Sequence, residues 1–69
     1  MNKKKLKQLK ERTKIKTLAE EAGTDRSYLS NILAGRDRCS YELAKKLAMA
    51  ANKLTFSYDY LPEDFRKDQ

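Results

Sequence analysis

Apolar residues recur along the chain at the spacing of short amphipathic helices. Residues 3–13 place Leu6 and Leu9 on one side and mostly lysines on the others. A second helix is expected to open at Thr13 or Lys14, with Thr13 accepting hydrogen bonds from the free amides of the first turn. Its apolar positions follow the i, i+3, i+4, i+7 pattern of one helix face, namely Ile15, Leu18, Ala19 and Ala22.

A third helix is predicted between Gly23 and Gly35, the two glycines of the chain, because a glycine just past a helix end favours termination. Asp25 is expected to start it, with its carboxylate accepting from the amide of Ser27 or Tyr28. At about 100° per residue, this helix divides into two halves. The apolar half holds Tyr28, Leu29, Ile32 and Leu33. The polar half holds Arg26, Ser27, Ser30 and Asn31.

A fourth helix follows an exposed turn over residues 36–39. Ser40 is expected to cap it, and it should run from Tyr41 to about Ala51, with Asn52 ending it. Its inner stripe is Leu43, Ala44, Leu47, Ala50 and Ala51. These helices predict an all-α fold, a small four- to five-helix bundle containing a helix-turn-helix at residues 14–34. With 69 residues, the chain is expected to be a single domain over residues 1–69.

The tail over residues 54–69 is ambiguous. Phe56, Tyr58 and Tyr60 alternate with polar residues, which is a strand signal. Ser57 could instead cap a single helical turn that Pro62 ends, and this short helix is the favoured interpretation. The aromatic tail could cap the core or form a dimer contact, since aromatic residues are enriched at interface centres. The candidate dimer residues are Phe56, Tyr58, Tyr60 and Leu61.

Charge is concentrated at the start of the chain. The net charge is +6, yet residues 1–16 hold eight basic residues and one acid, and so carry +7 while the remainder carries −1. A basic end on a near-neutral body indicates a polyanionic partner, although a solvated lysine-rich helix has the same composition. Residues 1–5 could form a flexible basic arm on DNA or a frayed terminus.

Composition argues against several function classes. There is no histidine and one cysteine, Cys39, so no Cys/His zinc cluster can form and the usual general base is missing. Cys39 itself is interpreted as an incidental small residue before a helix cap rather than a redox sensor. No apolar run is long enough to cross a bilayer and no signal peptide is present. We therefore expect no enzyme activity, cofactor, metal, membrane or small-molecule ligand. The single cysteine favours a reducing, cytoplasmic compartment.

The polar half of the third helix has the side chains that read base edges. Arginine pairs with guanine, asparagine with adenine, and serine with either. A face that merely met solvent in a chain with 38% charged residues would be expected to carry Lys and Glu. Arg26, Ser27, Ser30 and Asn31 are therefore the candidate base contacts. Ser and Asn facing water by chance is the structural alternative.

At this spacing the chain resembles the helix-turn-helix domain of the phage Cro and repressor family, also called the XRE family. The resemblance runs over residues 17–52 and rests on Leu18-Ala19, Gly23, Asp25, the run SYLS, Ile32, Gly35 and the Ser40-capped helix. It implies a recognition helix at residues 25–34 in the major groove of double-stranded DNA, with the four polar residues above at base-contact positions. It also implies phosphate contacts at the start of the second helix and in the loop after the third.

Two departures from the family pattern shift the implied phosphate contacts. The family often has Gln near the start of the second helix, where it holds a phosphate and orients a recognition residue. Ile15 stands at that position here and is apolar, so Lys14, Lys16 or Thr17 is expected to hold the phosphate instead. Ala34 stands where a polar residue often precedes the loop glycine. Arg36 and Arg38 are therefore expected to bind the DNA backbone.

The resemblance favours a small Cro-like repressor that binds a palindromic operator as a homodimer, at least on DNA. Two other function classes stay open. A non-specific nucleic-acid binder would explain the charge but not the acid-free, donor-rich face of the third helix. An antitoxin-type interaction module could use the same fold, with its tail masking a toxin.

Overall fold

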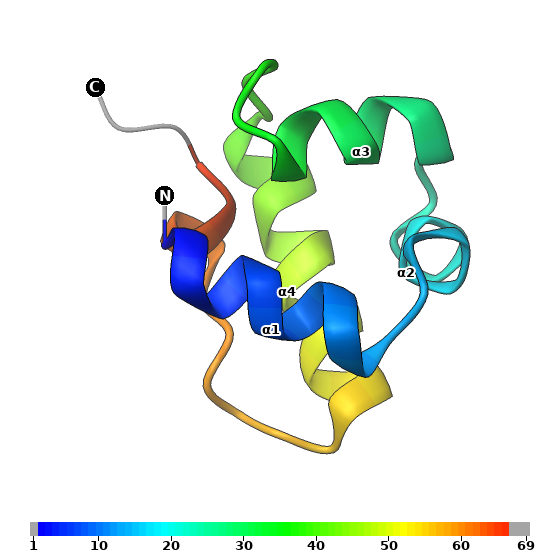
Figure 1. Ribbon diagram of the computed structural model, residues 1–69, viewed down its shortest axis with the longest axis vertical. Coiled ribbons are helices and arrows are strands. Elements are labelled where there is room, and N and C mark those ends of the chain that lie inside the picture. The colour runs from blue at the N-terminus through cyan, green and yellow to red at the C-terminus, as the bar shows by residue number, and fades with distance from the viewer. Residues whose placement is uncertain (1, 67–69) are drawn as a thin grey trace.

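Four α-helices and one 3-10 helix make up the computed structural model, which describes residues 2–66 (Figure 1). They are α1 (Lys3–Arg12), α2 (Ile15–Ala22), α3 (Arg26–Leu33), α4 (Tyr41–Thr55) and η1 (Pro62–Phe65). No strand occurs in this part of the chain, so the predicted all-α fold class is confirmed. None of the helices within residues 2–66 has the length and apolar character needed to span a membrane.

One hydrophobic core collects side chains from every element. Helix α4 runs through the middle of the bundle, with α1 in front of it in Figure 1 and α3 above α1. Small residues on α4 let its neighbours approach closely, because Ala44, Ala48 and Ala51 are buried against them. The largest fully buried side chains are Phe65, Leu6, Leu9, Leu18, Leu29, Ile32 and Leu47. The apolar stripes predicted for the four helices therefore face one another.

The start of the chain is helical rather than a flexible arm. Asn2 caps α1, with its side-chain oxygen accepting from the amide of Lys5 at 3.1 Å. The Asn2 amide also donates to the carbonyl of Asp64 at 3.3 Å. The expectation of a flexible arm at residues 1–5 is therefore wrong for residues 2–5, because capping and contact with η1 order them. Met1 lies outside the described residues.

Helix α2 has its N-cap position at Lys14, one residue after the expected cap Thr13. Thr13 instead ends α1, where its amide donates to the carbonyl of Leu9 at 2.9 Å. Lys14 is the residue before α2 and makes no side-chain hydrogen bond to the first-turn amides. The expectation that Thr13 caps α2 is therefore wrong, because the extended backbone at Thr13 belongs to the end of the preceding helix.

Helix α4 is one turn longer than predicted. It ends at Thr55, not near Ala51, and Phe56 follows in the left-handed conformation with φ of 53°. Asn52 does not end the helix, because its side chain binds the backbone of Tyr60. Its Oδ1 accepts from the Tyr60 amide and its Nδ2 donates to the Tyr60 carbonyl, both at 3.0 Å. A polar residue that looked like a helix end is thus a tertiary contact.

The tail is neither the strand nor the Ser57-capped helix considered from the sequence. Residues 57–61 are irregular, and Pro62 begins η1 instead of ending a helix. Proline suits a first helical position because its fixed φ fits and it has no amide to satisfy. The Asp64 carboxylate closes this turn by accepting from the Leu61 amide at 2.9 Å. Phe65 then enters the core with no exposed surface.

Candidate nucleic-acid interface

The turn between α2 and α3 is set by backbone hydrogen bonds around Gly23. The Gly23 amide donates to Glu20 at 3.2 Å and the Thr24 amide to Ala19 at 2.9 Å, which is a Schellman ending. Gly23 has φ of +74°, and a Cβ there would meet nothing within 4 Å. The requirement for glycine is therefore conformational rather than steric. This turn sets the direction of α3 relative to α2.

Helix α3 is held at both ends by local contacts. The Asp25 carboxylate accepts from the Tyr28 amide at 3.3 Å, as predicted. At the other end Gly35 has φ of +80°, and its amide donates to the carbonyl of Ile32 at 3.0 Å. Leu29, Ile32 and Leu33 are buried beneath the helix. The opposite face is thereby fixed toward solvent.

The four predicted base-contact residues lie together on that face. Arg26 and Ser27 are exposed, and Ser30 and Asn31 are half-buried. With Ile15 from the start of α2, they line one shallow groove of about 420 Å³. The structure thus brings the start of α2 beside the polar face of α3. Four hydrogen-bonding side chains without a carboxylate are suited to a partner rich in acceptors.

The predicted backbone-contact residues are accessible. Lys14, Lys16 and Thr17 are exposed at the start of α2. Because Lys14 does not cap the helix with its side chain, the first-turn amides remain available to an anion. Arg36 and Arg38 are exposed in the loop after α3. These two groups lie at the two ends of the helix-turn-helix.

Tyr28 lies at the edge of the α3 apolar half rather than fully inside it. The side chain is 37% exposed, and its hydroxyl donates to the Arg38 carbonyl at 2.8 Å. This bond ties the loop to α3. Sequence reasoning placed Tyr28 in the core and missed this role, because a hydroxyl at the boundary of two helical faces gives no periodic signal.

The basic residues of α1 divide into structural and free groups. Lys5 pairs with Asp64 at 2.9 Å and also binds the carbonyl of Asp59. Arg12 donates to the Thr55 carbonyl at 2.9 Å. Lys3, Lys4, Lys7 and Lys10 are exposed. The charge excess of the first 16 residues therefore includes two side chains that hold the tail and α4.

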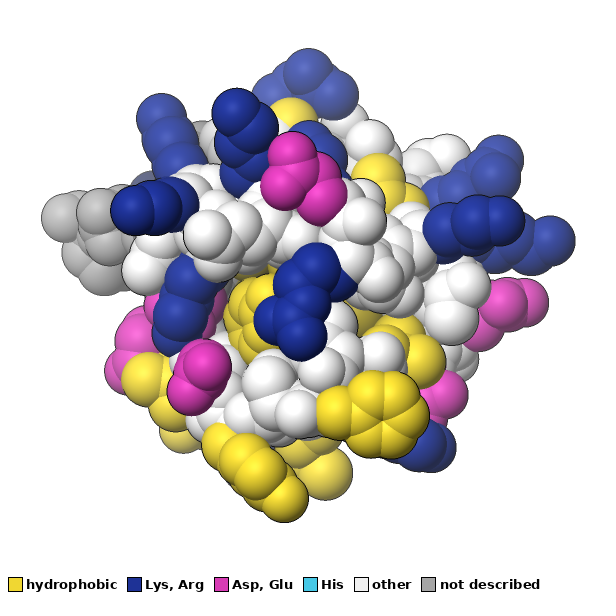
Figure 2. All heavy atoms as spheres, turned by 60° about the horizontal axis from the view of Figure 1, so that its bottom comes forward, with side chains coloured by type: hydrophobic (Ala, Val, Ile, Leu, Met, Phe, Trp, Pro, Cys, Tyr) yellow, Lys and Arg dark blue, Asp and Glu magenta, His cyan; other side chains and the backbone are white. Residues whose placement is uncertain are grey.

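The aromatic residues of the tail separate into buried and exposed sets. Tyr60 is 4% exposed and lies in the core, so this ring is a core cap and the expectation that it contacts a partner is wrong. Phe56 and Tyr58 are 95% and 94% exposed, and Leu61 is 48% exposed. Figure 2, which brings the lower end of the bundle forward, shows hydrophobic side chains gathered at one edge, away from most Lys and Arg.

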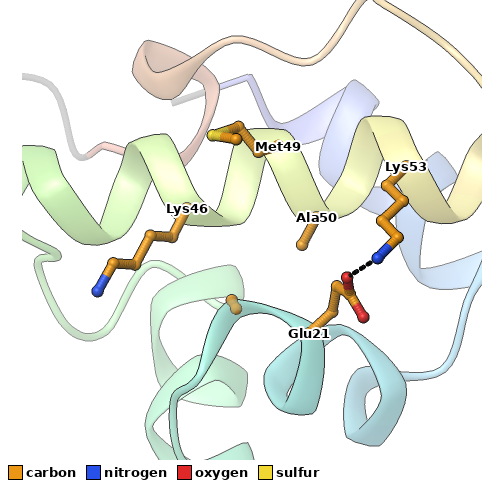
Figure 3. Close-up of a pocket in the computed structure, with 6 residues that line it drawn as sticks. Glu21, Lys46, Met49, Ala50 and Lys53 are labelled. Atoms are coloured by element: carbon orange, nitrogen blue, oxygen red, sulfur yellow. Dashed lines mark hydrogen bonds and ion pairs between the residues drawn. The ribbon is translucent and has the colours of Figure 1, made fainter.

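A second groove lies between α2 and α4 (Figure 3). Its volume is about 520 Å³, and Ala22, Ala50 and exposed Met49 contribute to its lining. Lys53 of α4 reaches across to Glu21 of α2 at 2.5 Å. Lys53 also lines the smaller groove beside Phe56 and Tyr58. The two grooves therefore share Lys53 as a common wall.

Cys39 is buried, contrary to the exposed turn predicted for residues 36–39. Its Sγ donates to the Phe65 carbonyl at 3.3 Å. Burial raises the pKa of the Cys39 thiol, and the positive charge of Arg66 acts in the opposite direction. The thiol lies where the loop after α3 meets η1, and a weak donor with a raised pKa has little of the thiolate that reactive cysteines need.

A family comparison supports the interpretation of these helices. A helix-turn-helix family model matches residues 3–58, which span α1 to α4. No curated protein and no solved structure shows significant similarity to the chain. The matching family is a DNA-binding, non-enzymatic domain. With α2, the Gly23 turn and α3 arranged as described, the chain belongs to the XRE-type helix-turn-helix family, as found in Cro and the lambda repressor.

Proposed function

We propose that the protein is a sequence-specific regulator that binds operator DNA as a dimer and represses transcription. The supporting observation is the groove in which Arg26, Ser27, Ser30 and Asn31 meet the start of α2. In the proposed complex, α3 lies in the major groove and these four side chains contact base edges. A non-specific binder would need the positive charge alone and would not need this carboxylate-free, donor-rich set.

Backbone contacts on both sides of α3 would fix its register. Lys14, Lys16 and Thr17, which are exposed, would hold one phosphate group together with the open amides of α2. Arg38 would hold another, because its backbone is tied to α3 through Tyr28. The exposed lysines of α1 add long-range attraction that falls with salt.

Selection of bound sequences from random duplex DNA tests the readout. We expect a palindrome whose half-sites are separated by about one helical turn, about 34 Å, because a two-fold dimer places two recognition helices at that distance. Affinity should also fall as salt rises. Salt-dependent binding without any enriched sequence would instead support the non-specific binder.

The dimer contact is assigned to the exposed part of the tail. Phe56, Tyr58 and Leu61 are exposed apolar side chains, and Phe56 and Tyr58 line one groove at the end of α4. A buried aromatic ring contributes about 150–250 Å², so this patch is smaller than the roughly 800 Å² per partner of stable complexes. The free protein should therefore be in a monomer–dimer equilibrium that DNA pulls toward the dimer.

The conformation of Phe56 also favours a partner. Its φ of 53° is the only positive φ of a non-glycine residue within residues 2–66. Glycine is the usual residue at this helix-ending position, since other residues pay a steric penalty in the left-handed region. An exposed phenyl ring at such a position favours neither the stability nor the solubility of the monomer. Burial of this ring by a second copy of the chain would explain why a phenylalanine occupies the position.

Tyr58→Asp tests this contact, with Tyr41→Asp as a matched control. Tyr41 is also an exposed tyrosine, 54% accessible, but it lies at the opposite end of α4. We expect Tyr58→Asp to abolish cooperative filling of the two half-sites in gel-shift titrations, while Tyr41→Asp retains it. Both variants should remain folded by circular dichroism. Cooperative filling by Tyr58→Asp would place the dimer contact elsewhere.

Repression is proposed because an operator-bound dimer would exclude polymerase from an overlapping promoter. Such a role places the protein with the DNA of its cell. A reporter under a promoter that overlaps the selected palindrome should be silenced, and silencing should be lost in Tyr58→Asp. Increased expression would identify an activator.

A further inference from the structure

We propose that Arg36 reads a guanine in each half-site and that Asn31 positions it. This inference rests on the proposed DNA-binding function and changes the roles of two side chains within it, because Asn31 becomes a positioning residue for Arg36. The family resemblance implies a backbone contact for Arg36. The hydrogen bond that joins it to the recognition face points to a base instead.

The backbone after α3 brings Arg36 back toward Asn31. Gly35, with φ of +80°, reverses the chain, and the Arg36 amide donates to the Asn31 carbonyl at 2.9 Å. Together with the bond from the Gly35 amide to the Ile32 carbonyl at 3.0 Å, this bond forms a Schellman ending. The ending brings Arg36 next to Asn31. A hydrophobic contact frequently joins these two positions in other proteins. Here a polar pair takes its place, beside the proposed DNA-contacting face.

The side chains of the pair are also joined. The Arg36 Nε donates to the Asn31 Oδ1 at 3.2 Å. Neither terminal nitrogen of the guanidinium has a hydrogen-bond partner among the described residues, and two adjacent donors match the O6 and N7 acceptors of guanine. The Asn31 Oδ1 accepts from Arg36, whereas in a direct contact with adenine it would accept from the adenine amino group. The pair therefore favours guanine over the adenine that Asn31 alone would select.

The electrostatics fit this role. Within residues 2–66, no ion pair joins Arg36 to a carboxylate, so its neutral partner leaves its full positive charge exposed to DNA. Arg12 gives a contrast, because its guanidinium donates to the carbonyl of Thr55 within the fold. Asn31 also lines the same groove as Arg26, which places the pair at one end of the recognition face.

Sequence selection with Arg36→Lys separates a base contact from a phosphate contact. Lysine keeps the charge but loses the planar fork, so we expect the guanine preference at one position of each half-site to fall about 5- to 150-fold. Preferences at the other positions should remain. Arg38→Lys is the matched control and should leave every preference unchanged.

The positioning role of Asn31 is tested by a double-mutant cycle. Asn31→Ala should weaken preference at the same guanine, and Asn31→Ala with Arg36→Lys should lose little more there than Arg36→Lys alone. An additive loss would overturn the positioning role. If Arg36→Lys keeps the guanine, the inference is wrong while the proposed function stands. If the unmodified protein selects no sequence, both are wrong.

Discussion

The polar face of α3 and the tail from Phe56 to Phe65 are both exposed in part, but different interactions hold them in place. Helix α3 is fixed by contacts that are close in sequence, with Asp25 at one end and Gly35 at the other. The tail is fixed by contacts with other helices, α1 and α4. Lys5 binds Asp64, and Asn52 binds the backbone of Tyr60.

This difference matches the work each surface is proposed to do. Base readout needs donors held at fixed spacing, and a regular helix on a packed core provides this. The tail has an irregular backbone whose exposed rings need only present apolar area to a second copy. A hydrophobic contact between exposed rings tolerates small changes in side-chain direction, whereas a hydrogen bond to a base edge does not.

The largest expected effect comes from removing the buried ring of the tail. Tyr60→Ala should lower the free energy of unfolding by about 3–5 kcal/mol, the range for buried aromatic rings. Tyr58→Ala should change it by no more than about 0.5 kcal/mol, because that ring is 94% exposed. Urea denaturation of both variants measures the contrast. Equal losses would mean that Tyr58 also packs within the monomer.

Removing a base reader should affect DNA binding and not folding. Arg26→Ala should weaken binding to the selected operator by about 1–3 kcal/mol and relax preference at one base position. Its unfolding free energy should stay close to that of the unmodified protein, because the side chain is exposed. Titration on operator and random DNA gives the readout. An equal loss on both would make Arg26 a backbone contact.

The local support of α3 is tested at its cap. Asp25→Ala should lower the unfolding free energy by about 1 kcal/mol, since the Tyr28 amide loses its acceptor. Asp25→Asn retains an acceptor and should recover most of that loss. Thermal denaturation of both variants provides the measurement. A loss near that of Tyr60→Ala would show that α3 depends on more than its local contacts.

Phe56→Gly should separate the stability of the monomer from its association. Relief of the left-handed strain opposes the greater chain entropy of glycine, so the unfolding free energy should be unchanged or rise by up to about 1 kcal/mol. Cooperative filling of the half-sites should nevertheless weaken. Denaturation and gel-shift titration on the same preparation test both parts. Unaltered cooperativity would remove Phe56 from the interface.

The smallest effect concerns Cys39, which links the loop after α3 to η1. Its folded pKa lies above the unfolded value of 9.0, so the thiol contribution to stability is complete below pH 9.0 and is lost as pH rises through the folded pKa. As the pH rises above 9.0, the unmodified protein should therefore lose stability slightly faster than Cys39→Ala. Denaturation of both variants below and above pH 9.0 measures this, and parallel curves would mean that burial of the thiol has no effect.

Much of α3 was predictable because its determinants are local. The polar set, the Asp25 cap and the two glycine endings follow from spacing and capping chemistry, and the structure confirms their placement. The role of Tyr28 and the Asn31–Arg36 bond were not predictable in this way. Both depend on how the loop folds back on the helix, which no periodic pattern records.

The sequence by itself determined the helices, their apolar stripes and the division of α3 into two faces, because these follow from side-chain period and capping within a few residues. Only the tertiary structure decided the end of α4, the path of the tail and which aromatic rings are buried. Asn52 could have ended a helix in isolation, and Pro62 could have ended one as well. Asn52 instead binds the backbone of Tyr60, and Asp64, in the turn that Pro62 begins, pairs with Lys5 of α1. Such pairings form only when the core brings the helices together.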